Sequence, residues 1–134
     1  MASTIPLSVA IDENPGILHW SLFIEAENDD DKTIIQVLGA RQRYFPEIRE
    51  RWDPRRLDSL LELLPLCRVD VSKIEMLKNI AYATPIRNDL ADWSCQDWIL
   101  AVLGKLEDAS IIDAADGDYI RNKEVVAAKR ESWP

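Results

Sequence analysis

The strongest constraint on the fold of this chain is a regular apolar stripe between residues 95 and 106. Apolar side chains recur at positions i, i+3, i+4, i+7, i+8 and i+11, which are Cys95, Trp98, Ile99, Val102, Leu103 and Leu106. This spacing predicts an amphipathic helix with one buried face. Ser94 precedes the stripe and Asp97 stands three residues later, which is the capping-box pattern of a helix start. The sequence therefore predicts a helix with Cys95 in its first turn, packed against another layer.

A second pattern, with a period of two, lies upstream. In residues 17–25 one face carries Leu18, Trp20, Leu22 and Ile24, and the other carries His19, Ser21, Phe23 and Glu25. Such alternation predicts a strand. The polar residues 27–32 and the segment TIIQVL at 33–38 then predict a turn and a second strand, which together form a hairpin. The acidic turn lacks EF-hand spacing, so we interpret it as a solvated hairpin tip. We interpret residues 1–16 as a polar start.

The middle of the chain is dense in charged and aromatic residues. Residues 40–56 contain six arginines, and Pro46 and Pro54 exclude a long helix. Two interpretations stay open for this segment: a salt-bridged surface, or a site where Arg41 and Arg43 bind an anionic substrate group. We expect a short helix at 57–64. A strand is expected at 67–71, with Cys67 as a small buried side chain.

Two further helices complete the prediction. Ser72 and Glu75 form a possible capping box for a helix over 72–81, and residues 118–129 are mildly helical. Together these elements predict one α+β domain over residues 1–134, with a small antiparallel sheet packed against helices on one face.

Composition excludes several functions. The chain has 24 acidic and 16 basic residues and a net charge of −8, which argues against nucleic-acid binding and against docking on an anionic membrane. Two cysteines and one histidine cannot form a Cys2His2 zinc site. No segment approaches transmembrane length, and we expect no secretory leader, because the N-terminal residues lack a basic region followed by a long apolar run. We expect a soluble cytoplasmic protein with reduced thiols, no cofactor and no metal, acting on a small-molecule or peptide-like substrate.

Cys95 is the candidate nucleophile. Unpaired N–H groups and the dipole at a helix start favour a thiolate and lower a thiol pKa. His19, the only imidazole in the chain, is the candidate base. Gln36 is a lone amide inside an apolar strand, and orienting the imidazole as the third member of a triad would explain it. The alternative is that Cys95 and His19 are two ordinary core residues.

Two short segments resemble a known family. His19-Trp20-Ser21-Leu22-Phe23-Ile24 and Cys95-Gln96-Asp97-Trp98-Ile99 are similar to the histidine and cysteine motifs of the circularly permuted papain-like group. This group is the NlpC/P60 superfamily in its lecithin:retinol acyltransferase-like arrangement. The Cys-Gln-Asp-Trp form is similar to small fungal proteins of this type. The resemblance implies a permuted papain-like fold, with Gln36 in the place where the family usually has a second histidine.

The expected activity is that of a cysteine-dependent hydrolase or acyltransferase acting on an amide, ester or thioester. Cys95 would attack the carbonyl and His19 would carry the proton. Trp93 is expected to border the cleft, and Trp20 either walls it or lies in the core. Two alternatives stay open: a non-catalytic domain that binds a ligand or protein, and an isomerase or cyclase that uses His19 as base and Cys95 as acid.

Overall fold

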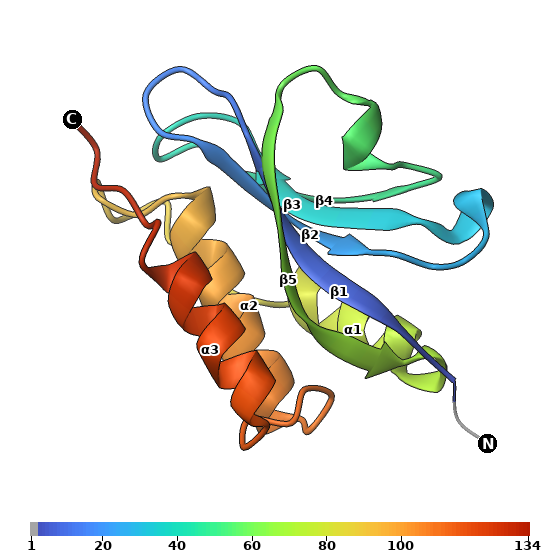
Figure 1. The fold of residues 1–134 in the computed structure, drawn as a ribbon. Coiled ribbons are helices and arrows are strands. Elements are labelled where there is room, and N and C mark those ends of the chain that lie inside the picture. Colours follow the sequence, from blue (N-terminus) through green and yellow to red (C-terminus); the bar gives the residue numbers. More distant parts are fainter. Residues whose placement is uncertain (1–2) are drawn as a thin grey trace.

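The computed structural model describes residues 3–134 and places an antiparallel sheet against helices (Figure 1). The strands are β1 (Thr4–Asp12), β2 (His19–Ile24), β3 (Thr33–Leu38), β4 (Phe45–Glu50) and β5 (Leu60–Asp70), in the spatial order β4-β3-β2-β1-β5. The helices are α1 (Ile74–Tyr82), α2 (Cys95–Asp108) and α3 (Gly117–Ala127). The α+β prediction is confirmed.

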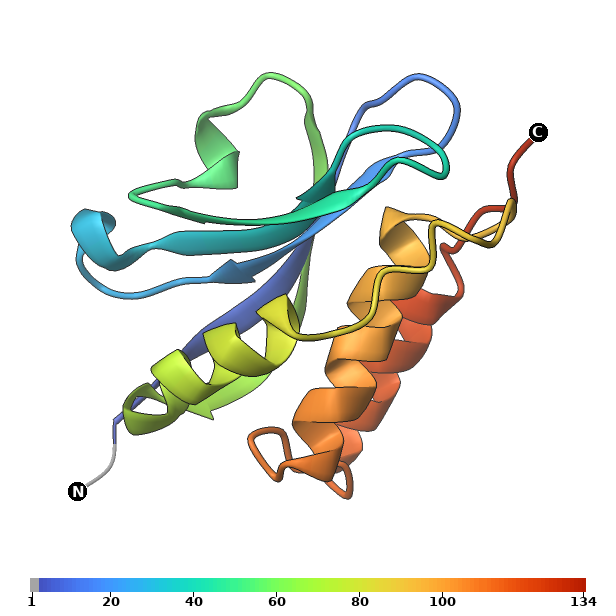
Figure 2. The ribbon, with the colours of Figure 1, turned by 180° about the vertical axis from the view of Figure 1, so that it is seen from behind.

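The sheet has two chemically different faces. In β2, Trp20, Leu22 and Ile24 belong to the hydrophobic core together with side chains of all three helices. Figures 1 and 2 show the helices gathered on one side of the molecule and the long loops on the other. His19 and Ser21 alternate with these core residues and therefore lie on the loop side. The predicted hairpin of β2 and β3 is confirmed, with Leu22 opposite Ile35.

The interpretation of residues 1–16 as a polar start is wrong for most of its length. β1 lies at the centre of the sheet, paired with both β2 and β5. Ile5, Leu7, Val9 and Ile11 alternate with smaller or polar residues, and all four are buried. This is the same period-two signal as in β2, because one face of β1 packs on the helices.

The predicted short helix at 57–64 is also wrong. Most of this segment forms the start of β5, which runs on through the strand predicted at 67–71 and pairs with β1 along its length. Leucine-rich sequence favours helix by propensity, but pairing with a buried central strand overrides that preference. The pairing of β1 with β5 is irregular near Leu66. As a result, the side chain of Leu66 points into the core and Cys67 is only half-buried.

The helix predictions fare better. In α2, Ser94 is the N-cap and Asp97 completes the capping box, and all six residues of the apolar stripe are buried. α1 begins at Ile74, two residues after the predicted cap Ser72, because Asp70 caps a preceding 3-10 turn instead. α3 agrees with the helical tendency predicted at 118–129.

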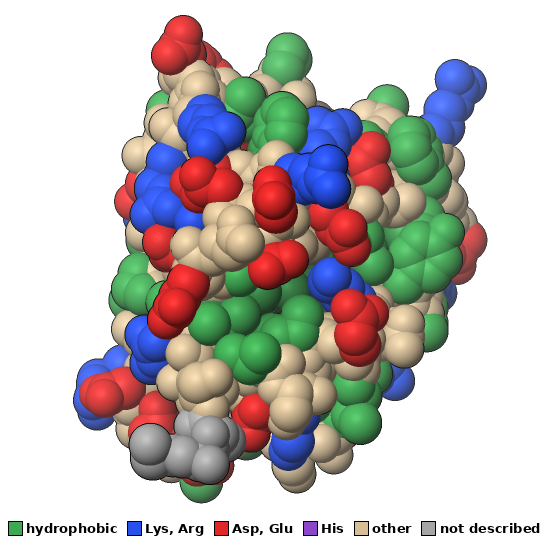
Figure 3. Space-filling view, turned by 90° about the vertical axis from the view of Figure 1, so that its right-hand side faces the viewer, with side chains coloured by type: hydrophobic (Ala, Val, Ile, Leu, Met, Phe, Trp, Pro, Cys, Tyr) green, Lys and Arg blue, Asp and Glu red, His purple; other side chains and the backbone are tan. Residues whose placement is uncertain are grey.

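The segment 40–56, for which no regular element was predicted, contains the edge strand β4. Pro46 is tolerated there because β4 pairs on one side only, with β3. On the face drawn in Figure 3, basic and acidic side chains are interspersed around a small apolar area. Among residues 3–134, no helix combines the length and the apolar character that crossing a membrane requires.

Candidate active site

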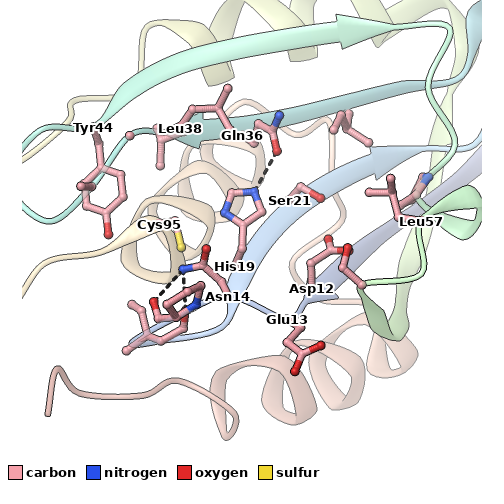
Figure 4. A pocket seen from close by; sticks show the side chains of 18 of the residues that line it. Asp12, Glu13, Asn14, His19, Ser21, Gln36, Leu38, Tyr44, Leu57 and Cys95 are labelled. Atoms are coloured by element: carbon pink, nitrogen blue, oxygen red, sulfur yellow. Dashed lines mark hydrogen bonds between the residues drawn. The ribbon is translucent and has the colours of Figure 1, made fainter.

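A cleft of about 620 Å³ on the loop side of the sheet brings His19, Gln36 and Cys95 together (Figure 4). His19 is the first residue of β2, and Gln36 lies on the neighbouring strand β3. α2 reaches the end of β2 through the carbonyl oxygen of Leu18, which lies 3.8 Å from the Cys95 sulfur and accepts a 2.9 Å hydrogen bond from Gln96. The helix start therefore places the thiol at the end of the strand that carries the imidazole.

A chain of hydrogen bonds fixes the imidazole of His19. Its Nε2 lies 2.8 Å from Oε1 of Gln36, and Nε2 of Gln36 donates to the Glu47 carboxylate at 2.8 Å. A carboxylate only accepts, so the amide of Gln36 must turn its oxygen toward His19. In the neutral imidazole, Nε2 of His19 then carries the proton and Nδ1 has the free lone pair. Figure 4 shows the Cys95 sulfur on the side of the ring away from Gln36. The free nitrogen is thus the one available to the thiol.

Glu47 was missed in the sequence. It lies on β4, directly opposite Gln36 in the strand register, within the segment for which no strand was predicted. Arg49 contacts the same carboxylate, with its Nη2 3.0 Å from Oε1 of Glu47. Two features of the sequence could have indicated this edge strand: charged residues at every second position, Glu47 and Arg49, and the neighbouring Pro46.

Burial changes the expected chemistry of Cys95. The side chain is only 3% exposed, and burial raises the pKa of its thiol to about 11. The backbone N–H groups of Trp20, Gln96 and Cys95 itself act in the opposite direction, but they do not outweigh desolvation. The predicted lowering of the thiol pKa by the helix start is therefore wrong for the free protein. Near pH 7 the thiol is neutral, and a base must remove its proton during any attack.

The raised pKa of Cys95 predicts a loss of stability at alkaline pH. The folded state binds the thiol proton more tightly than the unfolded chain, so this contribution is complete below pH 9 and disappears as the pH rises to about 11. The difference in pKa corresponds to about 2–3 kcal/mol. Urea unfolding measured from pH 7.5 to 10.5 should show this decline together with a similar one from Cys67, whose thiol pKa burial also raises to about 11, and Cys95→Ala should make the total decline shallower. An equally steep decline in Cys95→Ala would contradict the assignment.

Tyr44 is a second residue that sequence reasoning missed. It lines the cleft, and burial followed by the Cys95 thiol raises the pKa of its hydroxyl to about 12. Its ring packs edge-on against Trp93, with centroids 5.8 Å apart. The turn before Tyr44 requires a glycine at position 39 for two reasons. The φ of Gly39 is +111°, and a Cβ at this position would lie 2.3 Å from the carbonyl oxygen of Arg43. The phenol is thereby held next to the thiol as a further hydrogen-bonding group.

The C-terminal tail forms one wall of the cleft. Glu131 accepts hydrogen bonds from the Leu18 backbone N–H at 2.9 Å and from the buried amide of Gln96 at 3.0 Å. Two residues later, Trp133 lines the cleft and donates to the carbonyl oxygen of Trp93 at 3.2 Å. Nothing local in the tail sequence indicates this placement, because its partners lie at least 35 residues away.

The four predicted substrate-binding residues lie in different environments. Arg41 lines the cleft, but its guanidinium stacks on Trp133 and donates to the Ala91 carbonyl oxygen at 2.7 Å. Trp93 lies behind Tyr44 and lines a separate shallow pocket. Arg43 is exposed and is not part of the cleft wall. Trp20 has no exposed surface and lies in the core, so it is not a site residue.

Comparison with known proteins gives one family and no function. Residues 7–113 match the model of a family of unknown function (DUF6540). The chain belongs to this family. No curated protein and no solved structure shows significant similarity. The DUF6540 match includes His19, Gln36, Glu47 and Cys95 and ends before α3. Trp133, which lines the cleft, therefore lies outside the matched region.

Proposed function

We propose that this protein is a cysteine-dependent hydrolase or acyltransferase that acts on an amide, ester or thioester of a small-molecule or peptide-like compound. The observation that carries the proposal is the chain Glu47–Gln36–His19, which leaves one imidazole nitrogen free on the side of Cys95. A core histidine would need one hydrogen-bond partner. Here the partner, Gln36, is itself oriented by its hydrogen bond to Glu47, which selects the tautomer that a general base requires.

The arrangement supports a two-step acyl transfer. Nδ1 of His19 takes the thiol proton while the Cys95 sulfur bonds to the substrate carbonyl carbon, and the carbonyl oxygen becomes an oxyanion. The backbone N–H of Cys95, which the Ser94 cap does not use, and the hydroxyl of Tyr44 are the nearby donors for that charge. As the intermediate collapses, the imidazolium protonates the leaving group. Water, an amine or an alcohol then attacks the thioester, with His19 again taking the proton.

The order of elements supports a permuted papain-like assignment. A strand that begins with the histidine comes first, the next strand carries the orienting residue, and a later helix begins at the cysteine. This is the order that the resemblance of the two motifs implies. β4, β5 and α1 fill the chain between the hairpin and the helix.

A trapping experiment tests the proposal. The protein is incubated with a panel of activated esters and thioesters that carry short acyl groups, and intact-protein mass spectrometry is followed by peptide mapping. The expected result is a single acyl group on Cys95 that later disappears by hydrolysis or transfer. Cys67 is the internal control, because burial also raises its pKa to about 11 and Asp116, not an imidazole, is its charged neighbour. Equal labelling of both thiols, or none, would contradict the proposal.

One observation favours a second candidate function. The Cys95 thiol is almost fully buried and neutral, as in a core cysteine. A non-catalytic domain that binds a ligand in the cleft would show the same burial. In that case ligands would bind without any acyl group appearing on Cys95, and the mass spectra of the trapping experiment separate the two functions.

A further inference from the structure

The basic and the acidic side chains of the cleft wall differ in whether they have a partner of opposite charge. Arg41 and Arg49, the basic residues of its wall, both have partners within the protein: Arg41 contacts Asp92 and the Ala91 carbonyl oxygen, and Arg49 contacts Glu47 and stacks on Trp52. Their positive charges are therefore partly offset within the protein. The acidic side chains of the wall, in contrast, form no ion pair with any Lys or Arg in the described part of the chain. These are Asp12 and Glu13.

Asp12 is the unusual member of this pair. It is 8% exposed, and its one side-chain hydrogen bond comes from the hydroxyl of Ser59 at 3.2 Å. Burial raises the pKa of its carboxyl group, with the Ser59 hydroxyl and His19 acting in the opposite direction. A buried carboxylate without a basic partner is costly, and a cation bound in the cleft would recover that cost.

The position of Asp12 indicates which part of a substrate it meets. Asp12 pairs with His19 across β1 and β2, so both side chains lie on the loop side of the sheet. Figure 4 shows its carboxyl group beside Ser21, on the side of His19 away from Cys95. In the proposed acyl transfer, the acyl group is bonded to Cys95 and the leaving group receives its proton from His19. A group near Asp12 therefore belongs to the leaving group, or to the acceptor that later replaces it.

We propose that Asp12 binds a cationic group, an ammonium, on the leaving-group or acceptor portion of the substrate. The inference rests on the proposed function for the direction of the substrate, but the cation site itself does not require catalysis. It replaces the anionic substrate group that the arginine-rich segment suggested in the sequence. The exposed Glu13 at the cleft rim would add a weaker, solvent-screened attraction.

Two matched thioesters test the inference in the intact protein. Acetylthiocholine carries a quaternary ammonium on its leaving group, and the 3,3-dimethylbutyl thioester of acetic acid has the same shape with carbon in place of nitrogen. We expect kcat/KM to be about tenfold higher for the cation in the unmodified protein, the size of one partly buried charged contact of about 1.4 kcal/mol. Asp12→Asn keeps the shape and the bond from Ser59, and should remove that preference. Glu50→Gln, the matched control, removes an exposed carboxylate outside the cleft and should keep it.

Each outcome has a separate meaning. If Asp12→Asn slows both thioesters equally, Asp12 acts only on His19 and the inference fails. If the unmodified protein does not prefer the cation, the inference fails while the proposed function stands. A binding arm uses Cys95→Ala protein and compares butylammonium with butanol by calorimetry. Asp12-dependent binding of butylammonium alone would support the cation site even if no thioester reacts. Equal binding, or no binding, would overturn it.

Discussion

Replacing Cys95 with alanine should lower turnover of any thioester that acylates the protein by about 10⁴-fold or more, because Cys95 is the one thiol among the described residues of the cleft wall and the proposed nucleophile. The fold should survive, since the thiol contributes one weak 3.8 Å contact to a carbonyl oxygen and the change removes a single sulfur atom from the start of α2. The measurement is steady-state turnover of the best thioester from the trapping panel, with far-ultraviolet circular dichroism as the check on folding.

Cys67→Ala is the matched control for this experiment. Burial raises the pKa of both thiols to about 11, although Cys67 is only half-buried, and of the two only Cys95 shares a cleft with an imidazole. Cys67→Ala should retain turnover within about twofold, because a surface or half-buried substitution away from a site changes little. Retained turnover in Cys95→Ala would exclude the acyl-enzyme and favour acid–base chemistry by His19 without a covalent step.

How far the sequence predicts this fold depends on whether a pattern is local. The stripe from Cys95 to Leu106 and the capping pair Ser94 and Asp97 lie within one helix, and the structure contains them as predicted. The alternation in β2 and β3 is equally local. The first half of β5 is not, because its leucines fit a helix or a strand equally well and only the pairing with β1 decides between them.

The candidate site shows the same limit. The sequence singles out His19, Gln36 and Cys95 because each is an unusual residue in a regular element. It does not identify Glu47, Tyr44 or Asp12 as site residues, because their roles depend on strand pairing and loop closure over the sheet. The sign of the Cys95 pKa shift is also a tertiary property. A helix start lowers a thiol pKa, but the neighbours that bury the thiol come from distant parts of the chain.

The hydrogen-bond chain predicts a graded series of effects on acylation. His19→Ala removes the base from a thiol that is neutral near pH 7, and should slow acylation of Cys95 by about 10²–10⁴-fold. Glu47→Gln keeps the shape of the side chain, but the new amide can donate a hydrogen bond to Gln36. The amide of Gln36 can then turn its nitrogen toward His19, so the imidazole is no longer held in the tautomer with the proton on Nε2. This should slow acylation by about tenfold, the equivalent of one hydrogen bond to a charged group.

Stopped-flow acylation rates of Cys95 measure this series, with Glu50→Gln as the control because Glu50 is exposed on the same strand and contacts Lys78 outside the cleft. Added imidazole should restore part of the rate in His19→Ala, which a merely structural role of the side chain would not allow. Equal rates in the unmodified protein and His19→Ala would mean that the thiol loses its proton to solvent. The orientation of His19 by Gln36 and Glu47 would then serve the stability of the sheet and not the reaction.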